Sequence, residues 1–122
     1  MAFNLDKMYC GMVKRGDIFL GNFGNKEKVM VVLQDSILNE RLSTVVVAPI
    51  EPHRDGQRVF KNEVLLPERE TGLGQKGVCM LHKIQLASRT QMIAKKGEVS
   101  AVKLQDIYAA LDINLGRFRD RE

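Results

Sequence analysis

Cysteine is scarce in this chain, with two residues, Cys10 and Cys79, among 122. Neither a Cys-x-x-Cys nor a His-x-x-His spacing occurs, which argues against a structural zinc site. We therefore expect two free thiols, no bound metal and no other cofactor. Cys79 lies in an apolar run and is predicted to pack in the core, because free cysteine is among the most buried residue types.

Long hydrophobic runs are also missing. The longest uninterrupted apolar run, Val45 to Ile50, is far shorter than the roughly 20 residues that a membrane-spanning helix needs. Residues 1–12 contain Asp6 and Lys7 and lack a long apolar stretch, so they do not resemble a signal peptide. These features predict a cytoplasmic protein with no membrane contact.

No internal repeat and no low-complexity segment interrupts the chain. A length of 122 residues predicts one domain, residues 1–122, with flexible ends at 1–12 and 117–122. The net charge of +4 is compatible with binding a polyanion but does not by itself indicate it. The densest basic group, from His53 to Lys61, is equally compatible with an ordinary solvated loop.

Most of the chain has the pattern of β-strands. We predict strands at residues 13–22, 29–33, 44–50, 59–66 and 77–84, and residues 86–93 are ambiguous. The apolar, β-branched stretch 29–33 is typical of a strand buried on both faces. Asp35 or Ser36 is predicted to cap a short helical turn over 37–41. Pro49 lacks a backbone donor, so its strand should end or bulge there.

The segment from Ser100 to Gly116 is the one strong helix. Five apolar residues recur at three- and four-residue spacing and form a single stripe: Leu104, Ile107, Tyr108, Leu111 and Leu115. Ser100 suits the N-cap position and Gly116 the C-cap. Many strands followed by one terminal helix predict a mostly antiparallel barrel or sheet with a helix packed on it.

The order of motifs along the chain carries a family resemblance. Arg15-Gly16-Asp17 opens the first strand, Gln34-Asp35 ends the second, Asn39 lies in the helical turn, and Pro49 ends the third strand. Further on come Gly72-Leu73, the strand at Gly77, and Lys95-Lys96-Gly97-Glu98-Val99-Ser100 before the last helix. In this order, from about Val13 to Gly116, the chain resembles the MazF/PemK (Kid) toxins.

This resemblance implies a fold and an activity. It implies a mostly β fold: a small SH3-like antiparallel β-barrel with a C-terminal α-helix at about Ser100 to Gly116, acting as a homodimer. It also implies the toxin of a type II toxin–antitoxin system, a sequence-specific endoribonuclease that cleaves single-stranded mRNA. Such toxins use the adjacent 2′-hydroxyl and no metal. The implied partners are RNA and a cognate antitoxin, whose acidic or amphipathic tail would complement the mildly basic surface.

The chain departs from the family pattern at four places, of which one is the first loop, shortened here to Gly24 to Glu27. Lys28-Val29 stands where an Arg-Pro pair usually starts the second strand, and lysine lacks the planar fork that grips phosphate. Glu51 stands where a Thr or Ser commonly follows the end of the third strand. On the fifth strand, Met80 and His82 stand where some members carry an Arg and an Asp.

The implied reaction needs a base for the 2′-hydroxyl proton, an acid for the leaving 5′-oxygen and a cation for the phosphorane. The candidate catalytic residues are Lys28, Glu51 and His82. Lys28 is either the cation or an exposed strand-start lysine, and Glu51 is either the base or a surface carboxylate. His82 is the third candidate because histidine as a residue type suits acid–base work near neutrality, although a lone histidine is more often structural.

The candidate RNA-binding residues are Phe23, His53, Arg54, Arg58 and Lys83. The basic ones suit phosphate contacts, and Phe23, at a loop, suits base stacking. Phe19 is expected to pack against the barrel instead. Gln34, Asp35 and Asn39 are expected to fix the turn after the second strand by hydrogen bonds to the backbone.

Two alternative functions remain open at this point. One is a toxin that acts by binding, like CcdB on DNA gyrase, although the tail Arg117 to Glu122 does not resemble the C-terminus of those toxins. The other is a catalytically altered or inactive member of the family that binds RNA or an antitoxin without cutting. The missing hydroxyl at Glu51 supports this last reading.

Overall fold

The computed structural model describes residues 8–116. The tail 117–122 and residues 1–7, which the sequence predicts as flexible, lie outside the described residues. Residues 8–12, part of the same predicted flexible end, make specific contacts. Tyr9 donates its backbone N–H to the carbonyl of Met92 at 2.8 Å, and its ring packs edge-on against Phe19 with centroids 4.8 Å apart.

Within residues 8–116, seven strands and three α-helices follow one another. The strands are β1 (Asp17–Phe23), β2 (Lys26–Val32), β3 (Thr44–Pro52), β4 (Glu63–Leu66), β5 (Gly77–Met80), β6 (Gln85–Ser88) and β7 (Met92–Glu98). The helices are α1 (Ser36–Arg41), α2 (Glu68–Thr71) and α3 (Ala101–Leu115), and 3₁₀ turns cover Leu81–Lys83 and Arg89–Gln91.

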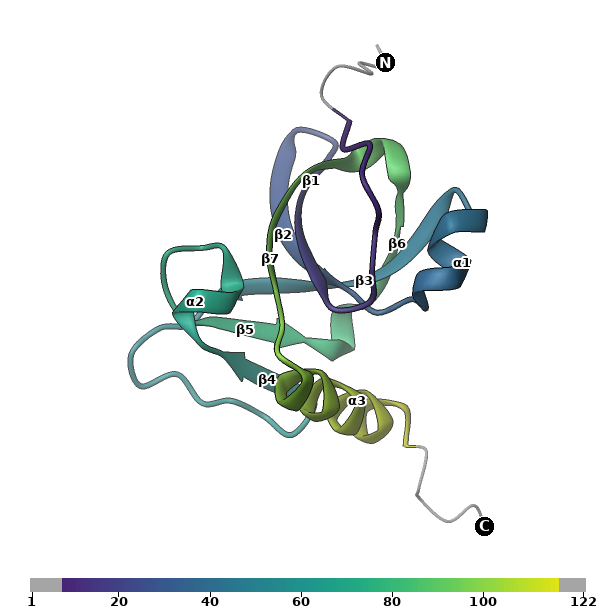
Figure 1. Cartoon of the computed structure of the whole chain (residues 1–122). Coiled ribbons are helices and arrows are strands. Elements are labelled where there is room, and N and C mark those ends of the chain that lie inside the picture. Colours follow the sequence, from purple (N-terminus) through teal and green to yellow (C-terminus); the bar gives the residue numbers. More distant parts are fainter. Residues whose placement is uncertain (1–7, 117–122) are drawn as a thin grey trace.

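All seven strands belong to one antiparallel sheet. Its order is β4-β5-β3-β2-β1-β7, and β6 pairs with β3 beside β5. Figure 1 shows the sheet curling, with α3 lying beside β4 at the end of the chain. Among the described residues the outer strands β4 and β7 do not pair, so hydrogen bonds do not close the curled sheet. The predicted mostly antiparallel β fold with a terminal helix is confirmed.

The core has two parts because β1 and β2 are buried on both faces. Ile18 and Val31 point into the part that Ile107 and Ala110 of α3 cover. Phe19 and Met30, each one residue away, point into the other part. Successive strand residues point to opposite faces, so each buried strand feeds both parts. The predicted packing of Phe19 is confirmed, as is that of Cys79, since both are fully buried.

Burial raises the pKa of the Cys79 thiol from 9.0 to about 12. The thiol is therefore held in its protonated, unreactive form at neutral pH.

Several predicted boundaries were wrong. The first strand begins at Asp17 and not at residue 13, and the fourth begins at Glu63 and not at residue 59. The fifth strand ends at Met80, so His82 lies in a 3₁₀ turn and not on a strand. The ambiguous stretch 86–93 divides between β6, a 3₁₀ turn and β7, and β7 continues through Lys95 to Glu98.

The turn after β2 is fixed by two of the three polar side chains expected there. Asn39 is buried and donates its side-chain amide to the carbonyls of Val13 and Gln34, both at 3.1 Å. Gln34 in turn donates to the Asn39 side-chain oxygen at 2.9 Å. Asp35 occupies the N-cap of α1 but makes no side-chain cap hydrogen bond. The predicted structural role is confirmed for Gln34 and Asn39.

The caps of α3 agree with the sequence. Ser100 accepts the backbone N–H of Lys103 at 3.2 Å, and Gly116 adopts the left-handed conformation at φ 65°. Buried Glu70 of α2 accepts the backbone N–H of Ser100 at 2.7 Å, which ties α2 to the start of α3.

Candidate active site

The site forms where β3 changes partners. One edge of β3 pairs with β2, while its other edge pairs first with β6 and then with β5. Between the pairs Val47–Gln85 and Ile50–Cys79, β3 has two residues, 48 and 49, and the facing chain has five, 80–84. The extra residues bulge out as the 3₁₀ turn opposite Pro49, which lacks a donor for a ladder bond. The prediction that the strand itself ends or bulges at Pro49 was wrong: β3 continues to Pro52 with Pro49 paired to Met30, and the bulge lies in the facing chain.

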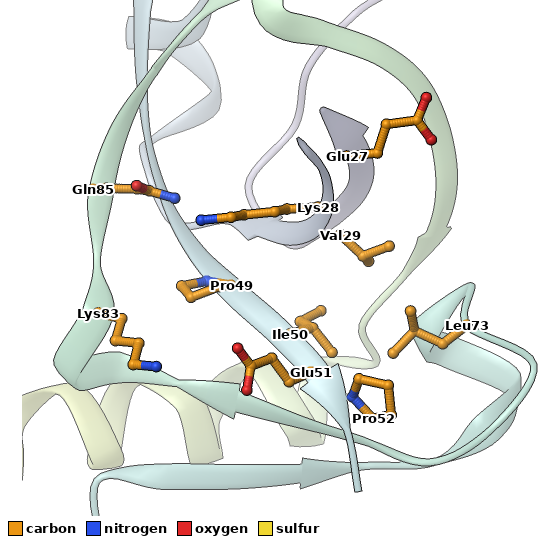
Figure 2. Close-up of a pocket in the computed structure, with 10 residues that line it drawn as sticks. All are labelled: Glu27, Lys28, Val29, Pro49, Ile50, Glu51, Pro52, Leu73, Lys83 and Gln85. Atoms are coloured by element: carbon orange, nitrogen blue, oxygen red, sulfur yellow. The ribbon is translucent and has the colours of Figure 1, made fainter. Parts of the chain in front are cut away.

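A pocket of about 410 Å³ lies beside this bulge. Figure 2 shows the ten residues that line it: Glu27, Lys28, Val29, Pro49, Ile50, Glu51, Pro52, Leu73, Lys83 and Gln85. They come from β2, β3, the β4–β5 loop, the 3₁₀ turn and β6. A volume of this size is in the range of small-molecule sites.

Strand register brings Lys28 and Glu51 into this pocket. Val29–Ile50 is the last pair of the β2–β3 ladder, and Lys28 and Glu51 lie one position beyond it on their strands. Opposite residues of an antiparallel pair project from the same face of the sheet. Both side chains are exposed, which leaves them free to meet a ligand.

Lys83 reaches the same pocket from the 3₁₀ turn, and its ammonium group and the Glu51 carboxylate point toward each other in Figure 2. Lys28 points toward the Gln85 amide on the same side. Within the described part of the chain, no salt bridge joins Glu51 to Lys28 or Lys83. The pocket therefore presents two ammonium groups, Lys28 and Lys83, and two carboxylates, Glu27 and Glu51, that are not neutralised by close contact.

A second pocket of about 550 Å³ continues from the first and shares Glu51 and Pro52 with it; Arg54 and Gln57 complete its lining. The loop there is ordered by its own hydrogen bonds. Gln57 donates its backbone N–H to the Arg54 carbonyl at 2.9 Å, and its side-chain oxygen accepts the Arg54 N–H at 3.0 Å. This turn leaves the Arg54 side chain exposed beside the site.

Of the eight predicted site residues, Lys28, Glu51, Lys83 and Arg54 come together around the two pockets, and the other four do not line either. His82 is exposed on the 3₁₀ turn. The His53 ring lies 3.1 Å from the Gln57 carbonyl, and Phe23 is half-buried against the core. These positions give no geometric support to catalysis by His82 or to RNA contact by His53.

Arg58 lies over the ring of Phe60, with its guanidinium carbon 5.0 Å from the ring centroid. Phe60 is 54% exposed, so the loop displays a cation and an aromatic face together.

Sequence reasoning missed Gln85 and Leu73 as pocket residues. Gln85 carries no signal of its own, since only the pairing of β6 with β3 brings it to the site. Leu73 lies in the motif Gly72-Leu73-Gly74, which lacks the ending of a phosphate-binding loop and so gives no functional signal by itself.

The arrangement can attract a phosphate, through the two lysines, and accept a proton, through Glu51. The described residues 8–116 contain no group of three or more His, Cys, Asp or Glu side chains placed to hold a metal ion. None of the helices within that range is both long and apolar enough to cross a bilayer.

Residues 14–115 match the family model of the PemK-like, MazF-like toxins of type II toxin–antitoxin systems, so the chain belongs to this family. It is a toxin of that class, and the family resemblance seen in the sequence is confirmed.

Solved structures share the fold. A mycobacterial endoribonuclease in complex with its cognate antitoxin matches with a TM-score of 0.74 at 20% identity, covering 84% of this chain and 94% of the other. The Mycobacterium tuberculosis toxin MazF-mt6 matches at 0.72 and 20% identity, covering 82% and 96%. A MazE–MazF structure from Deinococcus radiodurans matches at 0.71 and 20% identity, covering 88% and 98%.

Proposed function

We propose that this toxin is a metal-independent endoribonuclease that cleaves single-stranded mRNA at specific sequences. The observation that carries the proposal is the convergence of Glu51, Lys28 and Lys83 on one pocket. Of the similar solved proteins, one is described as an endoribonuclease and another as the toxin MazF-mt6, which supports this proposal.

The three side chains suffice for an attack by the RNA on itself. Glu51 takes the proton of a 2′-hydroxyl, and the 2′-oxygen forms a bond to the adjacent phosphorus. The bond from phosphorus to the 5′-oxygen then breaks, which leaves a 2′,3′-cyclic phosphate on one fragment and a 5′-hydroxyl on the other. Lys28 and Lys83 stabilise the phosphorane charge, and an ammonium group supplies the proton for the leaving oxygen.

Lys83 is the proton donor in place of the candidate His82, because Lys83 lines the pocket and His82 does not. Arg54 extends the positive surface into the second pocket, where its guanidinium group pairs with the next phosphate of the RNA. Arg58 and Phe60 offer a stacking platform beyond it. Phe23, which is half-buried, contributes through packing at the edge of the β1–β2 hairpin.

The toxin acts in the cytoplasm as a homodimer and is held inactive by a cognate antitoxin. The net charge of +4 favours an acidic segment in that partner. Two of the similar structures are toxin–antitoxin complexes, one mycobacterial and one from Deinococcus radiodurans.

The test is incubation of the purified protein with a long unstructured RNA in EDTA, with cut ends mapped by primer extension. We expect cuts at a limited set of sequences, unaffected by the chelator. Intact RNA at high protein concentration, from a protein shown to be folded, would overturn the proposal.

A second candidate is a toxin that binds RNA without cutting it. One observation favours it: the pocket contains two carboxylates, Glu27 and Glu51, that repel phosphate, and neither an imidazole nor a hydroxyl group lines it. Binding of RNA by the wild-type protein with no cut ends in the same assay would select this reading.

A further inference from the structure

The pocket has two chemically different sides. Figure 2 shows Leu73, Val29 and Pro52 gathered on one side, where the Glu27 carboxylate points away from the lysines, and Lys83 and Gln85 on the other. Ile50 lines the pocket between these two sides. A phosphate group would contact only the side with the lysines, so the apolar side is available to a different, apolar part of the ligand.

Leu73 packs against the core cluster that contains Ile50, and its loop is held in a fixed conformation. Gly72 and Gly74 on either side of it both adopt positive φ angles, 70° and 74°. The buried Thr71 hydroxyl accepts the Leu73 backbone N–H at 3.1 Å and donates to the Gln75 carbonyl at 2.7 Å. The β4–β5 loop is thereby fixed, and Leu73 remains only half-buried.

The first residue of β5, Gly77, packs closely against Ile50 and Leu73. A Cβ atom on Gly77 would lie 2.6 Å from Ile50 Cγ2 and 3.3 Å from Leu73 Cδ1. Glycine at this position lets the β4–β5 loop approach β3, so Leu73 and Ile50 form one continuous apolar wall.

We propose that this wall, with Leu73 as its principal contact, receives one unstacked base of the RNA while the adjacent phosphate lies between Lys28 and Lys83. This inference rests on the proposed function and adds a specificity-determining residue to it. A nucleotide carries an apolar ring face and an anionic group within one unit, which matches the two sides of the pocket. The pre-formed loop lowers the ordering cost when the base packs against Leu73.

The test couples a change in the protein to a change in the RNA. A labelled oligonucleotide with a 2′-O-methyl group at the mapped cut site is bound but not cut, and fluorescence anisotropy gives its affinity. Abasic versions lack the base at each of the two nucleotides flanking the cut in turn. Leu73→Ala is compared with the wild type and with Leu115→Ala, which changes an exposed leucine on α3 outside the pocket.

We expect Leu73→Ala to weaken binding of the intact oligonucleotide roughly tenfold, as loss of one base contact does. One of the two abasic oligonucleotides should bind the wild type and Leu73→Ala equally well, because the wall then has no base to contact. Leu73→Val should show the same pattern with a smaller loss, and it keeps the test available if the alanine variant unfolds. Leu115→Ala should bind like the wild type.

An equal loss on intact and both abasic oligonucleotides would overturn the proposal, because Leu73 would then act without a base. An unchanged affinity for the intact oligonucleotide would also overturn it. Failure of the wild type to bind any of the oligonucleotides would instead overturn the proposed function itself.

Discussion

Lys28 of β2 and Glu51 of β3 lie one position beyond the last ladder pair, Val29–Ile50, and line the same pocket. The two residues are 23 positions apart in the sequence, and only the register of the sheet brings them to the same pocket. A slip of one residue would turn one of the two side chains to the opposite face. The buried residues next to them, Val29 and Ile50, prevent this slip, so the core that stabilises the fold also aligns the two charges.

Glu51→Gln separates proton transfer from RNA binding. The amide cannot accept the 2′-hydroxyl proton as a carboxylate does, so we expect cleavage to fall by about 10²–10⁴-fold. RNA affinity should stay the same or rise, because a negative charge is removed from the phosphate site. Single-turnover cleavage and anisotropy binding measure the two effects, and Glu40→Gln on α1 is the matched control. Equal loss of binding and cleavage would show that Glu51 only supports the fold of the site.

Lys28→Ala removes a cation from the phosphate site. We expect a loss of about 10²–10³-fold in the cleavage rate, in the range found when one transition-state donor is deleted. Lys28→Arg keeps the charge and should restore much of the rate. Lys26→Ala, on the same strand but outside the pocket, is the control. A rate that depends as strongly on Lys26 as on Lys28 would point to general attraction of RNA in place of a specific role.

Lys95→Met tests the ion pair that links β7 to β1. Lys95 lies 3.2 Å from Asp17, whose side chain is 3% exposed, and 2.7 Å from Glu98. Loss of the cation leaves Asp17 with the Lys14 backbone N–H as its remaining hydrogen-bond donor, so we expect a cost of about 1–3 kcal/mol in the free energy of unfolding. Urea denaturation at pH 7 measures it, with Lys96→Met as the control. Equal stability of the two variants would contradict the structural role of the pair.

The same pair predicts how stability varies with pH. The hydrogen bond between Lys95 and Glu98 raises the pKa of Lys95 above 10.5 and lowers the pKa of Glu98 below 4.5. The Lys95–Glu98 pair therefore contributes its full share to the free energy of unfolding between pH 4.5 and pH 10.5, the ordinary pKa values of the two groups. It is lost as pH falls through the lowered Glu98 pKa or rises through the raised Lys95 pKa. The stability difference between wild type and Lys95→Met should shrink at acid pH, and a difference that grows there would contradict this assignment.

The two cysteines should differ sharply in reactivity. Cys79 is buried and its thiol pKa is raised to about 12, whereas Cys10 is exposed. We expect the native protein to react with one equivalent of a thiol reagent such as DTNB at pH 8, and with a second equivalent after unfolding. A Cys10→Ser variant should show no fast reaction. Rapid reaction of both thiols in the native protein would contradict the burial of Cys79.

The elements that could be predicted from the sequence are those whose signals are local. The helix near Ser100 to Gly116 was correct to one residue at each end because its stripe and both caps lie in the segment itself. Strand β7 was missed because Lys95, Lys96 and Glu98 do not have the pattern of a strand. Their extended conformation comes from pairing with β1, a tertiary contact. The alternation of apolar and polar residues at 59–66 predicted a strand that was too long. β4 begins only at Glu63, where β5 provides a hydrogen-bonding partner.

The site was predictable only in part, because tertiary contacts that are not visible in the local sequence bring its residues together. Lys28 and Glu51 were identified from their places in a family pattern, which the sheet register then explains. Lys83 was expected beside the RNA, but its entry into the pocket depends on the five-residue bulge opposite Pro49. His82 was misplaced because a continuous strand through 77–84 would have aimed it differently from the turn that forms there.

The most direct test of the central claim uses one RNA that contains a mapped cut site and the same RNA with a single 2′-deoxy nucleotide at that site, both in EDTA. The proposed reaction predicts that the first is cut, leaving a 2′,3′-cyclic phosphate and a 5′-hydroxyl, and that the second is bound but not cut. Cleavage of the deoxy-substituted RNA at the same bond would contradict attack by the 2′-oxygen. It would also contradict the role of Glu51 as the base that activates the 2′-hydroxyl.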